Sequence, residues 1–190
     1  MRPTDAVDLI PHPLATQTSP VRAVHASLSR DLGGLRIDAA LCGAKDALLV
    51  PAGTSSVRRD GLWRHTCIEF FAGPLSSTEY LEFNLSPAGE WALYHFKDTR
   101  DPLPLPSASP PQVQVQWAGQ DLRVVARLAV NEWAVLWIEE ELSVGLSAVL
   151  ESRSGALSYH AIHHPRDVPD FHDRRGWIGR LEATGSRGMT

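Results

Sequence analysis

The run EYLEFNLSPAGEWALYHFK at residues 79–97 carries the clearest structural signal in the sequence. Its first half alternates between apolar and polar side chains, so that one face carries Leu81, Phe83 and Leu85 and the other carries Tyr80, Glu82 and Asn84. A period of two residues is typical of a strand whose two faces meet different surroundings. Turn-forming residues follow at 86–89, and a second strand-like run follows at 90–97. We therefore predict an antiparallel β-hairpin over residues 79–97.

Short runs of the same kind recur on both sides of this hairpin. We predict further strands at 21–30, 35–41, 45–51, 66–72, 113–117, 122–130, 142–150 and 157–163. The first two of these are joined by Asp-Leu-Gly-Gly and form a second predicted hairpin. Residues 101–111 contain five prolines, which exclude a central strand or a helix interior. We expect this segment to be a long loop that crosses between two sheets.

The density of short strands favours an all-β fold. We predict a single domain, a two-sheet antiparallel β-sandwich of jelly-roll or immunoglobulin-like type, spanning residues 20–183. An irregular segment would precede it at 1–19, and a flexible tail would follow at 184–190. Only residues 131–141 are ambiguous, because their tryptophans and leucine also fit a helical turn.

Composition limits the classes of function open to the chain. The 190 residues carry a net charge of −4, which argues against a strongly basic nucleic-acid binder. No apolar run approaches the roughly 18 residues of a membrane-spanning helix, and none resembles a signal peptide, so we expect a cytosolic protein without membrane contact. Its only cysteines, Cys42 and Cys67, suit buried thiols rather than a zinc finger or a disulfide framework.

Residues 61–100 carry a family resemblance. The pattern comprises Leu62-Trp63, TCIEFF at 66–71, YLEFN at 80–84, Ser86-Pro87, Gly89, Trp91 and Tyr94, and it continues late in the chain with PDFHD at 169–173. In these residues the chain resembles bacterial DOMON-like domain proteins, which are related to family 9 carbohydrate-binding modules. The resemblance implies a two-sheet β-sandwich that binds sugar or haem in a pocket at one sheet.

Sugar binding is the favoured function, and the matched block holds residues suited to it. A sugar needs flat aromatic rings for its C–H faces and a few placed polar groups for its hydroxyls. The candidate ligand-binding residues are Trp63, Glu69, Glu82, Asn84, Trp91, Tyr94 and Arg100. Trp63 and Trp91 are the predicted stacking platforms, and strand alternation would place Glu69, Glu82 and Asn84 on one face. The open alternative is that the tryptophans are core residues and the polar group is a solvated sheet face.

Haem is a second ligand that the resemblance implies. Haem-binding relatives often hold iron with a methionine and a histidine. The only methionines here are Met1 and Met189, at the two termini, so a haem site would need two ligands from His65, His95, His160, His163 and His164. We therefore predict no cofactor, with haem as the alternative.

A metal ion is a third alternative, because histidines gather late in the chain. The candidate ligands are His160, His163, His164 and His172, with Asp167, Asp170 and Asp173 nearby. Their spacing matches neither HEXXH nor the cupin pattern. For His172 and Asp173 we expect a structural role instead, in which their hydrogen bonds pin the last segment.

We expect no catalytic activity. The sequence lacks the GxSxG, P-loop and GxGxxG motifs. Glu69 and Glu82 could form an acid–base pair like that of a glycosidase, and Cys67 could pair with His65, although its bulky neighbours argue against a reactive thiol. The prediction is a non-catalytic domain that binds a small molecule, with carbohydrate favoured. A protein-interaction module that recruits a partner to an exposed sheet face is the remaining alternative, and the oligomeric state is left open.

Overall fold

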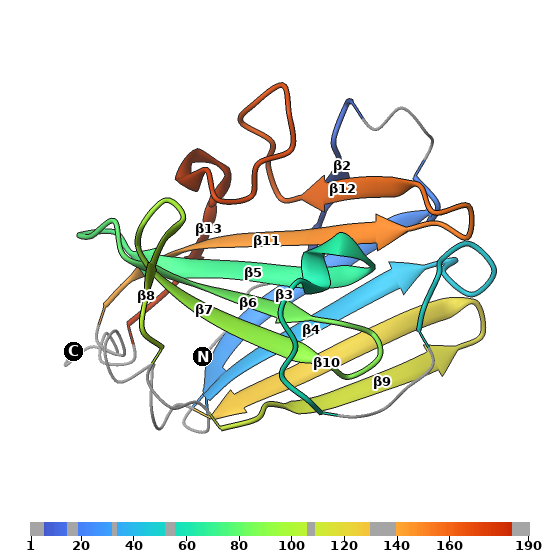
Figure 1. Ribbon diagram of the computed structural model, residues 1–190, viewed down its shortest axis with the longest axis horizontal. Helices are drawn as coiled ribbons and strands as arrows, with labels where there is room; N and C mark the ends of the chain where they lie inside the picture. Colours follow the sequence, from blue (N-terminus) through green and yellow to red (C-terminus); the bar gives the residue numbers. More distant parts are fainter. Residues whose placement is uncertain are drawn as a thin grey trace, which may run out of the picture.

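The computed structural model describes residues 6–14, 19–31, 34–51, 56–105, 109–129 and 140–183. Within them the chain forms two antiparallel sheets that pack face to face (Figure 1), which confirms the predicted all-β sandwich. The five-stranded sheet runs in the order β1 (Val7–Asp8), β3 (Ala23–Asp31), β4 (Gly34–Cys42), β10 (Asp121–Ala129) and β9 (Gln112–Ala118).

The eight-stranded sheet carries the family-like block at its centre. Its order is β2 (Ile10–Pro11), β12 (Leu157–Ala161), β11 (Leu142–Glu151), β5 (Cys67–Pro74), β6 (Tyr80–Leu85), β7 (Trp91–Asp98) and β8 (Asp101–Leu103), and β13 (Gly179–Leu181) pairs with β11. Two 3-10 helices, η1 (Leu62–Arg64) and η3 (Arg174–Gly176), complete the described elements. Neither approaches the length or hydropathy of a membrane-spanning segment, and the described residues hold no other candidate span.

Both predicted hairpins form. In β6–β7, Leu85 lies opposite Trp91, and the turn between them is closed by the Gly89 N–H, which donates to the Ser86 carbonyl. In β3–β4, Asp31 lies opposite Gly34. The alternating apolar and polar residues in the sequence therefore mark strands that pair with the next strand along the chain.

Three predictions need correction. The strand expected at 45–51 is wrong, because the Leu48 N–H donates to the Ala44 carbonyl and closes a helical turn that leaves only one bridge, Leu48 to Ser152. The proline-rich segment begins as an edge strand, β8, where Pro102 breaks no central ladder. It does then lead from the eight-stranded to the five-stranded sheet, as expected. The segment expected to be irregular at 1–19 contributes β1 and β2, one to each sheet.

Some predicted features cannot be compared with the structure. The tail at 184–190 lies outside the described residues, and so does most of the ambiguous run at 131–141.

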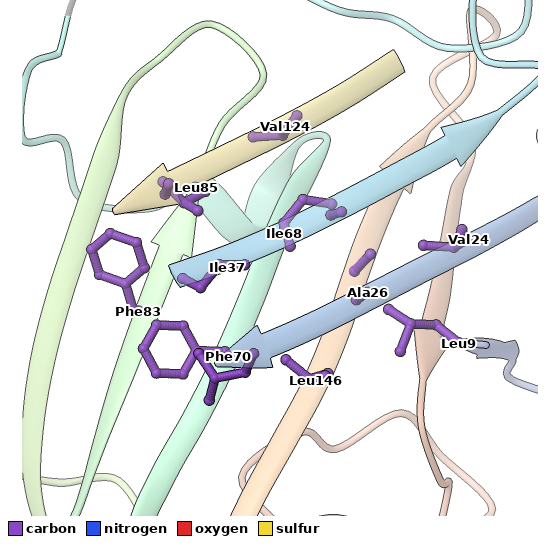
Figure 2. Packing of buried hydrophobic residues seen from close by; sticks show 14 of the residues in the cluster. Leu9, Val24, Ala26, Ile37, Ile68, Phe70, Phe83, Leu85, Val124 and Leu146 are labelled. Carbon is purple, nitrogen blue, oxygen red and sulfur yellow. The ribbon is translucent and has the colours of Figure 1, made fainter. Parts of the chain in front are cut away.

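The hydrophobic core lies between the two sheets. Alternate side chains from both sheets interdigitate there, as Figure 2 shows for Val24, Ala26, Ile37 and Val124 on one side and Ile68, Phe70, Phe83, Leu85 and Leu146 on the other. Strands β5 and β6 are buried along their whole length, on both faces. Their outer face is covered by a second cluster in which Phe71 and Tyr80 pack against Trp177 of the C-terminal segment. This outer layer positions the site described below.

The close approach of Trp177 to the sheet requires glycine at position 145. A Cβ atom built on Gly145 would lie 2.4 Å from Cδ1 of Trp177. We expect Gly145→Ala to lower the free energy of unfolding by about 1–3 kcal/mol, because the indole must move away from Phe71 and Tyr80. Urea unfolding checks this, with Ser143→Ala on the same strand and face as the control. Equal stabilities for the two variants would show that Trp177 does not hold this position.

Candidate ligand-binding site

A cavity of about 380 Å³ opens on the outer face of the eight-stranded sheet. Its floor is formed by strands β5, β6, β7 and β11, and its walls come from η1, β12 and the segment 169–172. Five of the seven predicted ligand-binding residues line it, namely Trp63, Glu69, Glu82, Tyr94 and Arg100. Their role in binding stays a prediction, but they do lie together around one space.

The strand register brings the floor residues together. Glu69 on β5 lies opposite Asn84 on β6 and opposite Ser147 on β11, while Glu82 lies opposite Tyr94 on β7. Because alternate residues share a face, Glu69, Glu82 and Asn84 all point away from the sandwich core. The floor is therefore a polar patch within an otherwise apolar sheet.

Glu69 is buried in this floor with few polar contacts. Its side chain is 3% exposed, and its Oε1 atom has no hydrogen-bond partner among the described residues. Burial raises the pKa of the Glu69 carboxyl well above its usual range, and the nearby Glu82 raises it further. Buried acceptors of neighbouring side chains, Asn84 Oδ1 and Ser147 Oγ, also lack partners. Such groups are uncommon in folded proteins, and a polar ligand in the cavity would satisfy that of Glu69, which lines it.

Glu82 is buried as well, but neighbouring side chains contact it. Its Oε1 accepts a hydrogen bond from Nδ2 of Asn84 at 2.8 Å. Burial raises its pKa to about 7, while the Asn84 hydrogen bond and the charge of Arg100 act in the opposite direction. Asn84 itself is fully buried and supports Glu82 from below instead of lining the cavity.

His172 belongs to a hydrogen-bonded chain at the rim. The backbone N–H of Arg100 donates to the Tyr80 hydroxyl at 3.0 Å, and that hydroxyl lies 2.7 Å from Nδ1 of His172. Burial and the Arg100 charge lower the pKa of His172 to about 4. His172 is therefore neutral at pH 7, with Nδ1 accepting from Tyr80 and Nε2–H facing Glu82 Oε2 at 3.4 Å. Although the distance would permit an ion pair, this contact is a neutral donor facing a carboxyl group.

Trp63 reaches the cavity from η1. Gly61 adopts the left-handed conformation (φ 81°) before this turn, and the buried Leu62 anchors it against Cys67 and Ala92. The Trp63 side chain remains 41% exposed, and its ring centroid lies 5.8 Å from that of Tyr94, edge to face. An exposed indole held at a cavity mouth suits the stacking role that the sequence predicts.

Trp91 does not share this role, and its assignment as a second platform is wrong. It lies in the core between the sheets, 4% exposed, with its ring stacked 6.4 Å from Phe83. The register explains the difference, because Trp91 pairs with the core residue Leu85 while Tyr94 pairs with Glu82 of the outer face. The alternative reading of a core tryptophan therefore holds for Trp91.

Sequence reasoning did not select several wall residues. Tyr159 of β12 and Phe171 face each other across 6.3 Å, edge to face, and both line the cavity. Phe171 lies in the PDFHD run, so the resemblance offered a signal for it, whereas Tyr159 lies in a strand with no distinguishing motif. The expected pinning by the two residues after Phe171 is observed. His172 contacts Tyr80, and Asp173 accepts from the backbone and guanidinium of Arg175.

Comparisons with known proteins support the fold. No protein-family model matches the sequence, and no curated protein matches it. A candidate carbohydrate-binding protein from Bacteroides uniformis has a similar structure, with 12% identity, a TM-score of 0.67, and coverage of 93% of this chain and 84% of that one. A family 9 carbohydrate-binding module from Caldicellulosiruptor kristjanssonii, in complex with cellotriose, shows 11% identity, a TM-score of 0.56, and coverage of 97% and 87%. The chain shares its fold with both proteins.

The histidines proposed as alternative metal or haem ligands are dispersed. His160 is buried beside the hydroxyls of Ser19 and Ser158, and His164 contacts the carbonyl of Ile10. His163 is exposed, whereas His172 belongs to the cavity rim. The described residues contain no group of three or more His, Cys, Asp or Glu side chains arranged to hold a metal ion.

The other two histidines also have partners of their own. His65 pairs with Glu151 at 2.7 Å, and His95 Nε2 lies 2.5 Å from Glu79. Cys67 is fully buried, and burial raises the pKa of its thiol well above the usual range. Because a thiol in this state is a poor nucleophile, the structure gives no support to a Cys67–His65 pair.

The buried Glu69 carboxyl makes the stability pH-dependent. Its pKa is raised in the folded protein, so ionisation opposes folding, and its contribution to stability falls as the pH rises above the ordinary value of 4.5. We expect Glu69→Gln to match the wild type near pH 4 and to be increasingly more stable toward pH 8, by about 1.4 kcal/mol per unit by which the pKa is raised. Urea unfolding at several pH values checks this, with the exposed Glu141→Gln as the control. A stability difference independent of pH would contradict the buried state of Glu69.

Proposed function

We propose that this protein is a non-catalytic carbohydrate-binding domain of the DOMON-like and family 9 type, which holds its sugar in the cavity on the eight-stranded sheet. The observation that carries the proposal is a buried polar floor beneath an exposed indole. Oε1 of Glu69 is buried there without a hydrogen-bond partner among the described residues, Glu82 lies beside it, and Trp63 lies at the mouth. A sugar supplies what both features need, hydroxyls for the floor and an apolar ring face for the indole.

The dimensions and walls of the cavity suit such a ligand. Its volume of about 380 Å³ falls within the range of small-molecule sites, about 300–1,000 Å³. We place one sugar ring against Trp63 with its hydroxyls toward Glu69 and Glu82, and the guanidinium of Arg100 at the rim donates to a further oxygen. Tyr159 and Phe171 close the opposite side. The two similar structures support this choice of ligand, because the B. uniformis protein is a candidate carbohydrate-binding protein and the C. kristjanssonii module is in complex with cellotriose.

The arrangement of the carboxyl groups favours binding over hydrolysis. A glycosidase places one carboxyl on each side of the scissile bond. Here Glu69 and Glu82 rise from neighbouring strands of one floor, and Asn84 lies opposite the first and donates to the second. Both would therefore contact the same side of a sugar.

Isothermal titration calorimetry with neutral mono- and disaccharides and with cellotriose tests the proposal. We expect saturable binding at one site per chain, with a Kd between about 1 μM and 1 mM, and no release of shorter sugars when cellotriose is incubated with the protein. The absence of saturable binding for every sugar would overturn the carbohydrate assignment. Shorter products from cellotriose would overturn its non-catalytic part.

A further inference from the structure

Among the residues that the structure describes, no cationic side chain is paired with the carboxyl group of Glu69. Its opposite neighbours on the two adjacent strands, Ser147 and Asn84, are neutral, and the thiol of Cys67 lies two residues before it on its own strand. The charge of Glu82 also repels an ionised Glu69, in addition to the cost of burying that charge. Burying an ionised carboxyl without a counter-charge is costly. We therefore look for the counter-charge in the ligand that the cavity would bind.

The cationic groups around the cavity are bound to other carboxylates. Arg100 contacts Asp170 at 2.8 Å, and its charge also lowers the pKa of Glu82. Arg58 contacts Asp60 at 3.0 Å. His172, from the segment that covers the floor, is neutral at pH 7. Among the described residues that line or border the cavity, no cation is left to balance Glu69.

The aromatic walls, like the acidic floor, favour a ligand with a positive charge. The π-faces of tryptophan, tyrosine and phenylalanine attract cations. Trp63 and Tyr94 stand on one side of the cavity and Tyr159 and Phe171 on the other. In the protein itself, the guanidinium of Arg58 already lies over the ring of Tyr94, 5.7 Å from its centroid.

We infer that the preferred ligand is an amino sugar, a pyranose whose free amino group enters as an ammonium and donates to the unpartnered carboxylate of Glu69. The inference rests on the proposed function, because it names the class of sugar bound in the same cavity. An N–H donor with a full positive charge forms the stronger, charge-assisted kind of hydrogen bond with a carboxylate. A neutral hydroxyl in that place leaves the Glu69 carboxyl protonated.

This assignment has a consequence for protons. Without ligand, burial and the neighbouring Glu82 raise the pKa of the Glu69 carboxyl well above its usual range, which favours its protonated form. When the ammonium binds, the carboxyl ionises and one proton passes to the buffer, and the charges in the floor then balance. Binding of an amino sugar is therefore coupled to proton release, whereas binding of the parent sugar is not.

The test compares matched ligands by calorimetry at pH 7 and low salt. D-glucosamine, D-galactosamine and D-mannosamine are each titrated beside the parent sugar and the N-acetyl derivative, in two buffers of different ionisation enthalpy. We expect at least one free amine to bind about tenfold or more tightly than both of its neutral counterparts, a difference of about 1.4 kcal/mol. We also expect the apparent enthalpy of that titration alone to depend on the buffer, as proton release requires.

Glu69→Gln separates the charge from the shape. Glutamine keeps the size of the protonated carboxyl and one donor and one acceptor, so neutral sugars should keep their affinity within about threefold. The amino sugar should lose about tenfold or more, and its proton release should disappear. Glu141→Gln, on the exposed surface outside the cavity, should leave the affinity for both kinds of sugar unchanged.

The outcomes distinguish this inference from the proposed function. If a parent sugar binds as tightly as its amine, the amino-sugar assignment is overturned and sugar binding stands. Undiminished amine binding by Glu69→Gln overturns it as well, because the carboxylate is then not the partner. If neither charged nor neutral sugars bind, the proposed function falls together with the inference. Proton release by the wild type needs no variant and supports the assignment independently.

Discussion

Replacing Trp63 by alanine is expected to weaken sugar binding by about 30- to 100-fold, or about 2–3 kcal/mol, while the protein stays folded. The indole is 41% exposed and lies at the cavity mouth on a three-residue helix, so few core contacts depend on it. A bound sugar would cover its face, and that buried apolar area is what alanine removes. Calorimetry gives the change in affinity, and circular dichroism with thermal melting gives the state of the fold.

Trp117 provides a matched control for this experiment. It is 42% exposed on β9, the edge strand of the other sheet, and it is absent from the cavity lining. Trp117→Ala should therefore leave sugar affinity unchanged and stability close to that of the wild type. If Trp63→Ala unfolds the protein, or binds sugar as well as Trp117→Ala does, then Trp63 is not the stacking platform.

The opposite result is expected at Trp91. Trp91→Ala should lower the free energy of unfolding by about 3–5 kcal/mol, a large share of the roughly 5–15 kcal/mol that stabilises a typical domain. The indole is 4% exposed and fills the space beside Phe83 between the two sheets, so alanine leaves a cavity there. Chemical denaturation measures the loss.

A second variant separates packing at Trp91 from ligand contact. Trp91→Phe keeps an aromatic ring in the core and removes the indole N–H, which has no hydrogen-bond partner in the described structure. It should cost less than half as much stability as alanine and leave sugar affinity unchanged. A folded Trp91→Phe protein that no longer binds sugar would restore Trp91 to the binding site.

The sequence predicts the strands well because most of them pair with neighbours in the chain. The alternation at 79–97 is strict, since β6 and β7 each divide a core face from the cavity face. The same reasoning placed Glu69, Glu82 and Asn84 on one face, as the pairing of β5 with β6 has them. It failed at 45–51, where apolar residues fill a helical turn, because the turn buries Leu48 as effectively as a strand would.

The parts of the site that escaped sequence reasoning depend on long-range packing. That Trp91 faces the core and not the cavity is decided by the register across the β6–β7 turn, which places Trp91 opposite Leu85. The walls formed by Tyr159 and Phe171 exist because the C-terminal segment crosses the outer face, where Trp177 packs over Gly145. Neither contact leaves a periodic signal in the chain.

Nuclear magnetic resonance of the tryptophan indole N–H groups tests the central claim, sugar binding in this cavity, most directly. Four indoles in the described residues report on different places: Trp63 on the cavity mouth, Trp91 on the core, Trp117 on the other sheet and Trp177 on the outer aromatic cluster. Titration with the tightest-binding sugar should move the Trp63 signal most and leave those of Trp91 and Trp117 in place. A bound sugar that moves Trp117 and not Trp63 would contradict the account, because the ligand would then lie on the other sheet.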